Sequence, residues 1–365
     1  MMSDDARPFS QAELAEDDDH VTPEAAAPAD DGVPHAPPGP RTIELVSVGA
    51  APRLDRYLTA LHPEYSRSYI QGLIEEGRVT VDGRPAVARE KVKAGMRLRI
   101  DVPAPEDPTP QPEDIPLDIL YEDADLLVVN KRPGMATHPS AGHPTGTLVN
   151  ALLAHCGGSL SGINGVRRPG IIHRLDLETS GALVVARNDH AHRTLSDALR
   201  RRDVRREYLA LVQGEMREDE GRIDTYLGRS PHDRLKRAVV SASASDARLA
   251  ATRWRVRKRY HGATLLECQL ETGRTHQVRV HLQSIGHPVV GDALYGYRAE
   301  VILAKVGMEA FQHIKPAVGR VRRQVLHAWR LSFPHPTTGT DMSFEAPLPD
   351  DLQQVLHIFD RWATS

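Results

Sequence analysis

The residues best placed to do chemistry lie in a short polar turn that precedes an apolar run. Residues 170–187 combine this turn, which contains Asp176, with the run Ala182–Ala186, which predicts a buried strand. An acid on a short loop beside a buried strand can be held rigidly while it faces a cleft, so Asp176 is a candidate catalytic carboxylate. Arg174 lies two residues earlier, and both side chains leave the same face if the backbone is extended. A surface turn with a solvated Asp is the other interpretation that these residues allow.

Two further polar stretches lie in the same part of the chain. Tyr208 follows a basic run and leads into a predicted strand, and residues 272–279 read Thr-Gly-Arg-Thr-His-Gln-Val-Arg. After a strand that ends at Leu270, we expect a helix from Thr275 to a glycine cap at Gly286. The residues of this helix that are expected to face inward are Val278, Leu282 and Ile285.

The composition is that of a globular protein with more than one domain. The chain has 365 residues, of which 40% are hydrophobic and 26% are charged. No apolar run approaches the roughly 18 residues of a membrane helix, and the start lacks the basic and apolar regions of a signal peptide. The two cysteines, Cys156 and Cys268, suggest neither a disulfide framework nor a metal cluster. We therefore expect a cytoplasmic protein, which we also take to be a monomer.

The charge is distributed unevenly. Residues 1–40 hold ten acids and one base, which leaves 45 bases and 39 acids in the rest of the chain, a net charge of +6. Residues 1–42 are polar and acidic with few large apolar residues, which predicts a disordered tail. The mildly basic remainder permits a phosphate-rich partner without requiring one.

Residues 52–102 form a small predicted α+β unit. Leu54, Leu58 and Leu61 mark one face of a helix, Ser66 can cap a second helix, and Asp82-Gly83 is a hairpin signal. The outward positions are basic and comprise Arg53, Arg56, Arg67, Arg78, Arg89, Lys91 and Lys93. This pattern resembles the S4 RNA-binding domain, and the resemblance makes Arg53, Arg67 and Arg78 candidate RNA-binding residues. A small domain with a solvated basic face is the alternative.

A proline-rich linker, residues 103–116, separates this unit from a body that spans residues 117–350, and residues 351–365 are expected to form a C-terminal helix. In the body, Thr147 can cap one helix, and a second helix is expected around Ala191–Leu199. Residues 298–323 have the character of a variable insertion.

The three polar stretches together resemble the RluA-type pseudouridine synthases. With the S4-like unit in front, the chain is similar to the large-ribosomal-subunit branch of that family, the RluC- and RluD-like members, from about residue 52 to 350. One departure is Arg132, which stands before Pro133-Gly134 where the family usually has Lys-Pro. The resemblance implies an α+β fold whose catalytic domain is mixed and mainly antiparallel. It also implies the isomerisation of uridine in RNA, with 23S ribosomal RNA as the favoured substrate, without a metal or a cofactor.

The resemblance also assigns roles to residues. Asp176 is the expected essential carboxylate, Tyr208 is expected to stack on the target uracil, and Arg279 is favoured over Arg274 as the ion-pair partner of Asp176. The target base must be flipped out of its stack, and Arg174 is expected to fill the gap. Further pocket or RNA contacts are expected from His173, Leu175, Arg274 and Leu282. Whether Asp176 attacks C1′ or supports a glycal route stays open.

Histidines offer a competing interpretation because the chain has 18 of them. His173, His276 and His281 are better explained as packing or hydrogen-bonding residues than as metal ligands, and the chain lacks a phosphate-binding glycine loop of the Walker or dinucleotide type. Two other functions remain open: a ribosome-assembly or RNA-binding protein without catalysis, and an enzyme of the same chemistry that acts on transfer RNA.

Overall fold

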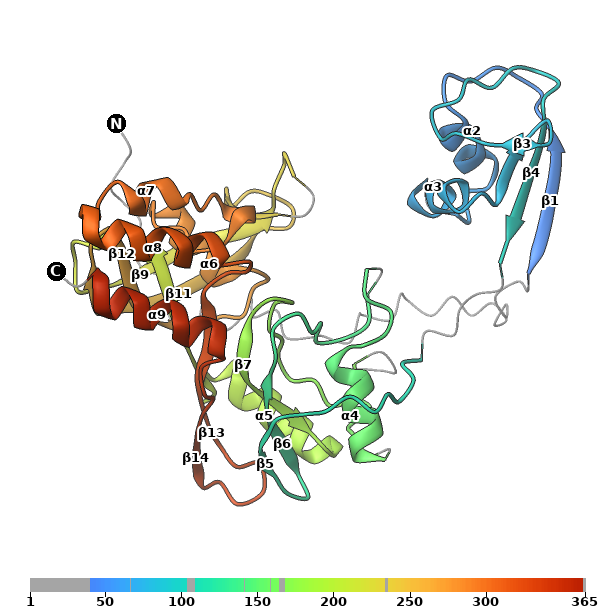
Figure 1. Cartoon of the computed structure of the whole chain (residues 1–365). Helices are drawn as coiled ribbons and strands as arrows, with labels where there is room; N and C mark the ends of the chain where they lie inside the picture. Colours follow the sequence, from blue (N-terminus) through green and yellow to red (C-terminus); the bar gives the residue numbers. More distant parts are fainter. Residues whose placement is uncertain are drawn as a thin grey trace. The chain divides into compact units, whose positions relative to one another are not determined.

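The computed structural model divides the chain into two compact units, which separate after Pro108 (Figure 1). The residues that it describes are 40–65, 67–103, 109–140, 142–157, 159–163, 168–233 and 236–363. Three features of the sequence analysis fall largely or wholly outside these ranges: the acidic tail, the cap at Ser66 and residues 104–108 of the linker. Each unit has a hydrophobic core of its own.

The N-terminal unit consists of two short helices and a four-stranded antiparallel sheet of order β1-β4-β2-β3. Its elements are β1 (Arg41–Val46), α2 (Leu54–Leu61), α3 (Arg67–Glu75), β2 (Val79–Val81), β3 (Arg84–Pro85) and β4 (Arg97–Val102). Leu54, Leu58 and Ile70 bring the apolar faces of the two helices into the core of this unit. Asp82 and Gly83 have φ angles of 49° and 82°, the left-handed conformation that the expected tight hairpin turn requires.

Strand β1 was not expected, because the predicted unit began at residue 52. Its half-buried residues Ile43 and Leu45 alternate with exposed Thr42 and Glu44, a period of two that indicates a strand at the edge of a sheet. The signal was weak because this edge strand is covered on neither face to the extent of β4.

The second unit is built on a ten-stranded sheet of order β10-β9-β11-β12-β8-β13-β7-β6-β5, with β14 paired to β13. The strands are β5 (Ile119–Glu122), β6 (Leu126–Lys131), β7 (Ser180–Ala186), β8 (Arg205–Gln213), β9 (Glu220–Arg229), β10 (Arg237–Val240), β11 (Arg248–Tyr260), β12 (Ala263–Leu270), β13 (Leu326–Pro334) and β14 (Asp341–Glu345). Within this sheet the β13–β7 pair is parallel and the other pairs are antiparallel. The expected α+β fold with a mixed, mainly antiparallel catalytic domain is confirmed.

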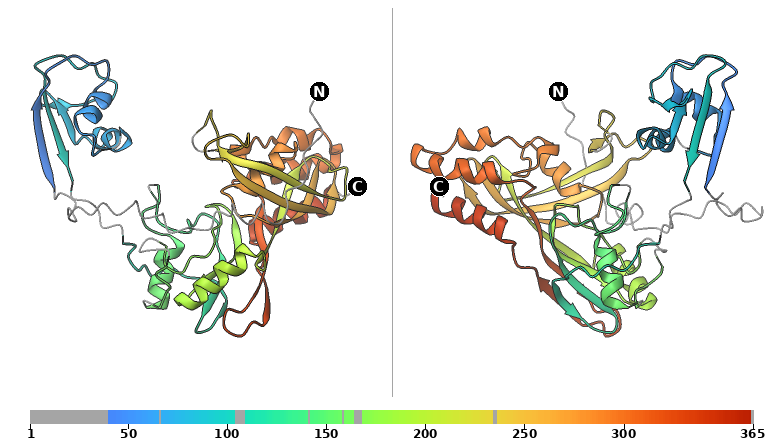
Figure 2. Two further views of the ribbon diagram at one scale, coloured as in Figure 1. Left: turned by 180° about the vertical axis from the view of Figure 1, so that it is seen from behind. Right: turned by 45° about the vertical axis from the view of Figure 1, so that its right-hand side comes forward.

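Helices pack on both faces of this sheet, and their apolar side chains contribute to its three main hydrophobic cores. They are α4 (Leu148–Cys156), α5 (Asp189–Arg200), α6 (Gln277–Ser284), the 3₁₀ turn η1 (Ala293–Tyr295), α7 (Ala299–Leu303), α8 (Met308–Arg320) and α9 (Asp350–Trp362). Figures 1 and 2 show α7, α8 and α9 gathered on one side of the strands β9, β11 and β12. Among the described helices, none has the length and apolar character needed to cross a bilayer.

Strand β7 shows why the central apolar run could be predicted as a buried strand from the sequence. Leu183 and Val185 point into the core that contains α4, whereas Ala182 and Val184 point into the core that contains α5. A strand buried on both faces has no polar side, and its sequence is therefore a continuous apolar run. The same position makes it a rigid base for the turn that precedes it. Helix α4 begins where expected, because the Thr147 side chain accepts a backbone hydrogen bond at its N-terminus. Helix α5, expected around Ala191–Leu199, begins at Asp189, where the Asn188 side chain accepts such a bond.

Two local predictions differ from the structure. Helix α6 begins at Gln277 instead of Thr275, and Ile285, expected to face inward, is 38% exposed just beyond its end. Residues 298–323 form α7 and α8, whose Ile302 and Ile314 are fully buried in a core shared with α9. Pro316 inside α8 obscured that helix in the sequence, since proline disfavours helix interiors.

Candidate active site

Asp176 lies on the turn that leads into β7, and this turn is held in place through its backbone. Thr179 N donates to the carbonyl of Asp176 at 3.0 Å, which closes the turn. Thr137 Oγ1 donates to the carbonyl of Leu175 at 3.0 Å from the segment after β6. The side chain of Asp176 is 15% exposed, so its carboxylate is close to solvent while its backbone is fixed.

Lys131, the last residue of β6, holds the same turn through hydrogen bonds. Its Nζ donates to the carbonyls of Arg132, Met135 and Leu177 at 3.0, 2.8 and 3.2 Å, and the residue is 1% exposed. Burial lowers the pKa of Lys131 to about 7, against the opposing charges of Asp176 and Glu178. The lysine therefore ties the residue after Asp176 to the end of β6.

Arg279, on α6, is clamped between two carboxylates. Its Nη1 lies 3.1 Å from Asp176 Oδ2, while its Nε and Nη2 lie 2.6 and 3.0 Å from the carboxylate oxygens of Asp292. The side chains of Arg279 and Asp292 are 8% and 1% exposed. Burial opposes the charge on Arg279, but the hydrogen bonds and charge of Asp292 together with Asp176 raise its pKa above the ordinary value. Asp292 thus fixes the edge of the guanidinium formed by Nε and Nη2, and the remaining nitrogen, Nη1, is directed at Asp176.

Tyr295 completes the surroundings of this arginine. The guanidinium carbon of Arg279 lies 4.9 Å from the centre of the Tyr295 ring, a cation–π contact. The Tyr295 hydroxyl is 2.8 Å from His276 Nδ1 and accepts the backbone N–H of Arg237 at 3.0 Å. Burial is the main cause that lowers the pKa of His276 and raises that of Tyr295. These contacts join η1, α6 and β10 around Arg279.

Tyr208 presents an aromatic ring from the centre of the sheet. It lies on β8, opposite Cys268 of β12 and Ala328 of β13, and is 5% exposed. Burial raises the pKa of Tyr208 to about 12, so the phenol is neutral at physiological pH. The strands on both sides hold the backbone of Tyr208 in register.

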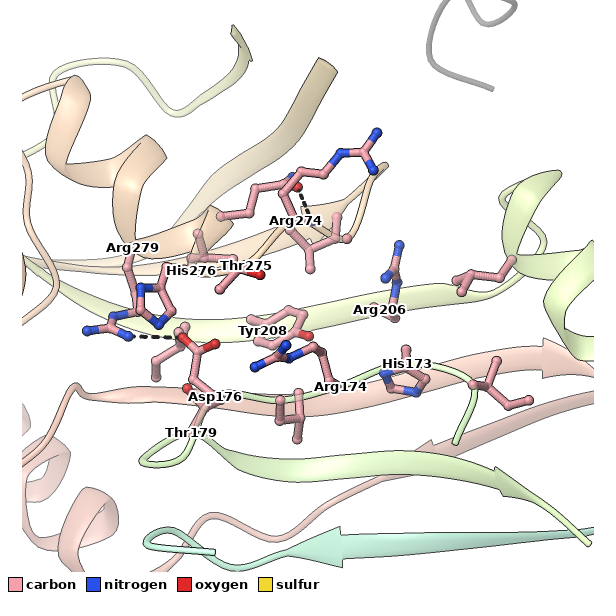
Figure 3. A pocket seen from close by; sticks show the side chains of 18 of the residues that line it. His173, Arg174, Asp176, Thr179, Arg206, Tyr208, Arg274, Thr275, His276 and Arg279 are labelled. Atoms are coloured by element: carbon pink, nitrogen blue, oxygen red, sulfur yellow. Dashed lines mark hydrogen bonds and ion pairs between the residues drawn. The ribbon is translucent and has the colours of Figure 1, made fainter. Parts of the chain in front are cut away.

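These groups meet in one pocket of about 260 Å³. In Figure 3, Asp176 and Arg279 face one another with Tyr208 beside them, and Arg174 points into the same space. The lining consists of Arg168, Ile172, His173, Arg174, Leu175, Asp176, Thr179, Leu199, Arg206, Tyr208, Leu270, Gly273, Arg274, Thr275, His276, Gln277, Val278, Arg279 and Leu326. An anionic carboxylate, an aromatic surface and several guanidinium groups can together hold an anionic substrate that contains a planar ring.

Comparison with known proteins shows the family of this chain. The profile of the family described as RNA pseudouridylate synthase matches residues 125–284, and the profile of the S4 domain matches residues 52–98. An RNA pseudouridine synthase of Bacillus subtilis is 44% identical over 304 residues, which cover 83% of this chain and 93% of that protein. The chain belongs to the RNA pseudouridylate synthase family.

Other relatives agree with this assignment. Ribosomal large subunit pseudouridine synthase D of Neisseria meningitidis is 43% identical over 87% of this chain and 80% of its own length. The protein of the same name from Zymomonas mobilis is 44% identical, with 82% and 92% of the two chains covered. The solved structure of human RNA pseudouridylate synthase domain containing 1 aligns with a TM-score of 0.50 and 26% identity over 69% of this chain and 90% of that chain. The protein is a pseudouridine synthase that acts on RNA, and the resemblance inferred from its motifs is confirmed.

The pocket of the synthase contains most of the residues that the sequence singled out. Arg174 is exposed, whereas Leu175 and His173 are buried, and all three line the pocket. His173 Nε2 accepts the backbone N–H of Val184 at 3.3 Å, and burial lowers the pKa of His173 to about 3, which keeps the ring neutral. His173 thus combines a place in the lining with the hydrogen-bonding function expected of it. Arg274 also lines the pocket, but its Nε donates to the carbonyl of Leu249 at 2.8 Å.

Leu282 does not line the pocket, and the expectation that it would do so is wrong. It is fully buried in the core with Val278, which lies one helical turn earlier and does line the pocket. Four residues of α-helix advance the chain by about 6 Å, and this advance carries Leu282 past the cavity into the packing beneath it. His281, one residue earlier, hydrogen-bonds to the hydroxyls of Thr252 and Thr225 at 2.8 and 3.0 Å.

In the N-terminal unit, two of the expected RNA-binding arginines are engaged by a buried acid. Asp55 is fully buried and accepts hydrogen bonds from Arg53, Arg67 and Gln71. The hydrogen bonds of Arg53, then those of Arg67 and Gln71, lower the pKa of Asp55 despite its burial. Arg78 is exposed and pairs with Glu76 at 2.7 Å. The contacts of Arg53 and Arg67 fix the start of both helices, and a role for the three arginines in RNA binding stays a prediction.

Sequence reasoning missed Asp292 and Tyr295. Both lie between Gly291 and Gly296, a stretch to which the sequence analysis assigned no role. A buried acid in a turn rich in glycine was the available signal, since an acid is rarely buried without a charged partner. Another three-residue group, comprising Asp123, Asp125 and His335, brings possible metal-ligand atoms within 4.8 Å of one another.

This second group already has partners within the protein. His335 Nε2 lies 2.8 Å from Asp123 Oδ2, and the Thr337 hydroxyl donates to Asp125. None of these residues lines the pocket around Asp176. Their contacts join the β5–β6 turn to the loop after β13, and the absence of a metal from the reaction stays a prediction.

Proposed function

We propose that the synthase converts specific uridines of large-subunit ribosomal RNA to pseudouridine, with Asp176 as the essential carboxylate. The observation that carries this proposal is the pocket in which Asp176 lies 3.1 Å from a clamped Arg279 and beside the ring of Tyr208. The substrate class is supported by the relatives named ribosomal large subunit pseudouridine synthase D, which match more than four-fifths of this chain. An S4 domain in front of the catalytic unit agrees with a structured RNA substrate.

The proposed reaction is an isomerisation that needs no group from outside the substrate. The bond between C1′ and N1 of the uridine breaks, the uracil turns within the pocket, C1′ bonds to C5, and the proton on C5 is released as N1 gains one. The Asp176 carboxylate promotes this change either by attack on C1′ or through a glycal route. Arg279 holds the carboxylate in position, and Tyr208 offers the ring on which the uracil rests while it turns.

The target base must leave its stack to reach this pocket. A carboxylate that lines a pocket of about 260 Å³ cannot meet C1′ of a nucleotide that remains inside a helix. Arg174 is exposed at the pocket and close to Asp176 in sequence, and we propose that it enters the space that the base vacates. The cytoplasmic location and the monomeric state stay predictions.

The experiment that tests the function compares purified wild type, Asp176→Asn and Asp203→Asn on transcripts of large-subunit ribosomal RNA and of transfer RNA, with pseudouridines mapped by carbodiimide sequencing. Asp203 is exposed and lies outside the pocket, so its variant controls for the loss of one carboxylate. We expect specific sites in ribosomal RNA with wild type and Asp203→Asn, and none with Asp176→Asn. Activity of Asp176→Asn would refute the mechanism, and sites confined to transfer RNA would refute the substrate.

A further inference from the structure

A second hollow lies beside the catalytic pocket and is strongly basic. Its volume is about 190 Å³, and it is formed where β9 ends and where β10 and β11 begin. The lining residues are Leu227, Arg229, Arg237, Asp246, Arg248, Arg274 and Thr275. Arg274 and Thr275 line the catalytic pocket as well, so the two spaces adjoin through this pair of residues.

The charges in this hollow are not balanced from within. Four arginines face a single carboxylate, that of Asp246. Asp246 accepts the backbone N–H of Arg229 at 2.8 Å and lies 3.8 Å from a guanidinium nitrogen of Arg237. Arg248 donates to the carbonyl of its neighbour Ala247. Within the part of the chain that the structure describes, neither the Arg229 nor the Arg248 guanidinium forms an ion pair with a carboxylate.

Arginines on the nearby sheet face are paired with acids, so the excess of positive charge is confined to the hollow. Arg255 on β11 pairs with Glu267 at 2.8 Å, and Arg222 on β9 pairs with Glu271 at 2.9 Å. In the hollow, by contrast, Arg229 and Arg237 are direct cross-strand neighbours on β9 and β10. Like charges in opposite positions of an antiparallel pair destabilise a sheet, and structural need alone therefore does not explain them.

The backbone of the hollow is coupled to the catalytic site. The N–H of Arg237 donates to the hydroxyl of Tyr295, the residue whose ring lies against the guanidinium of Arg279. Arg274 starts the turn that leads through Gln277 into α6, which carries Arg279. An anion in the hollow would therefore lie at a fixed position relative to Asp176.

We propose that this hollow binds a backbone phosphate of the RNA strand next to the nucleotide that enters the catalytic pocket. The inference rests on the proposed function for the identity of the ligand. Guanidinium groups present pairs of N–H donors that match phosphate oxygens, and a hollow that adjoins the pocket meets the strand as it leaves the flipped nucleotide. The phosphate supplies the negative charge with which Arg229 and Arg248 form no ion pair among the described residues.

The test measures the affinity of the full chain for a ribosomal RNA fragment at several salt concentrations. In the variant Arg229→Gln/Arg248→Gln, two exposed arginines lose their charge while the sheet keeps its hydrogen bonds. Loss of the contact with this one phosphate is expected to flatten the slope of log Kd against log salt by about 0.7 to 0.9 and to raise Kd at least about tenfold at low salt. Arg229→Lys/Arg248→Lys keeps the charge and is expected to restore most of the slope.

The matched control is Arg193→Gln/Arg320→Gln. These two arginines are exposed on α5 and at the end of α8, and they line neither hollow. The control removes the same net charge, and we expect its salt slope to stay close to that of wild type. An equal loss in both double variants would reduce the effect to net charge and overturn the site, and so would a normal slope in Arg229→Gln/Arg248→Gln.

Failure of the proposed function gives a different result. If wild type binds RNA but forms no pseudouridine, the function is wrong, whereas the salt slopes still decide whether the hollow binds phosphate. Circular dichroism and thermal unfolding show whether each variant is folded. If the double variant does not fold, Arg248→Gln alone is measured, and a smaller change of slope in the same direction is expected.

Discussion

Asp292 holds Arg279, in the candidate active site, from the side opposite Asp176. Its carboxylate makes two hydrogen bonds to Arg279 and accepts the backbone N–H of Tyr295. Because all of these groups are buried, Asp292 fixes the direction in which the remaining guanidinium nitrogen points. The function of this residue is to position Arg279, since Asp292 does not line the pocket itself.

Replacement of Asp292 by Asn is therefore expected to lower the single-turnover rate by about a hundredfold, because displacement of a positioned group by about 1 Å has an effect of that order. RNA affinity should change much less, since the pocket lining is intact. The measurement is the rate of pseudouridine formation at saturating RNA, together with Kd for the same RNA. A variant whose Kd rises while its saturating rate stays normal would contradict the positioning role. Asp203→Asn is the control.

Lys131 is expected to make stability depend on pH in the alkaline range. Its pKa is lowered to about 7 in the folded protein by burial, from an ordinary value of 10.5. Between these two values the unfolded chain binds more protons than the folded one, so the free energy of unfolding rises with pH, by up to about 1.4 kcal/mol per pH unit. Below pH 7 both states carry the proton and this contribution to the pH slope disappears.

The variant Lys131→Met removes this titration along with three hydrogen bonds. We expect a smaller increase of unfolding free energy between pH 7 and 10 in the variant than in wild type, whatever its absolute stability. Urea unfolding at several pH values measures both slopes. Parallel curves for the two proteins would show that Lys131 is charged in the folded state throughout this range.

At the scale of elements, the site depends on the contact between β7 and β13. Gly181 of β7 lies opposite Ala328 of β13, with a φ of 121°, and a side chain at Gly181 would collide with the Ala328 backbone. Ala328 is also opposite Tyr208 across the β13–β8 pair. The close approach of these strands therefore sets the distance between the Asp176 turn and Tyr208.

Gly181→Ala is expected to reduce the free energy of unfolding by about 1–3 kcal/mol, since the clash is with backbone and the φ angle disfavours alanine. We expect the variant to lose a larger fraction of its pseudouridine-forming activity than of its free energy of unfolding. Gly319→Ala is the matched control, because Gly319 lies in α8 with open space around its Cα, and there we expect a gain of up to about 1 kcal/mol. Equal stabilities of the two variants in thermal unfolding would show that the β7–β13 contact is more adaptable than its geometry indicates.

The elements that were predicted correctly are those with a regular apolar period. Helix α5 has its buried residues at helical spacing, and β7 has an uninterrupted apolar run. The start of α6 has no such signal. Residues 272–276 are held by the Gln277 side chain, which accepts hydrogen bonds from Thr272 and from the Arg274 N–H, and His276 has a φ of 58°. Because of these contacts the helix begins two residues later than expected. A periodic pattern of apolar residues does not reveal contacts of this kind.

The same limit applies to the active site. Asp176, Tyr208 and Arg279 could be singled out because they stand in motifs with a family resemblance, and the structure brings them to one pocket. Asp292 pairs with Arg279 because the turn after Val290 folds back along α6. That contact joins residues 13 positions apart, across the rest of α6 and the turn that follows it, and neither helical nor strand spacing indicates it.

At the scale of the whole molecule, the two units are expected to fold independently. Each has a separate core, and the separation falls after Pro108. Gln111 and Glu113, within the predicted linker, hydrogen-bond to Asn150 and Gly146 of the second unit. A truncation that removes residues 1–108 keeps these contacts, whereas one that removes residues 1–116 loses them.

We expect the protein without residues 1–108 to unfold in a single transition and to isomerise a short RNA that contains only the target loop. Its affinity for a long ribosomal RNA fragment should fall at least about tenfold at physiological salt, because phosphate contacts of the S4 domain are lost. Removal of residues 1–116 should give the same RNA affinity with lower thermal stability, because the contacts of Gln111 and Glu113 with α4 and the turn before it are lost as well. If the shorter deletion leaves the affinity for long RNA unchanged, the S4 domain does not contribute to substrate binding, and selection of the RNA target belongs to the catalytic unit alone.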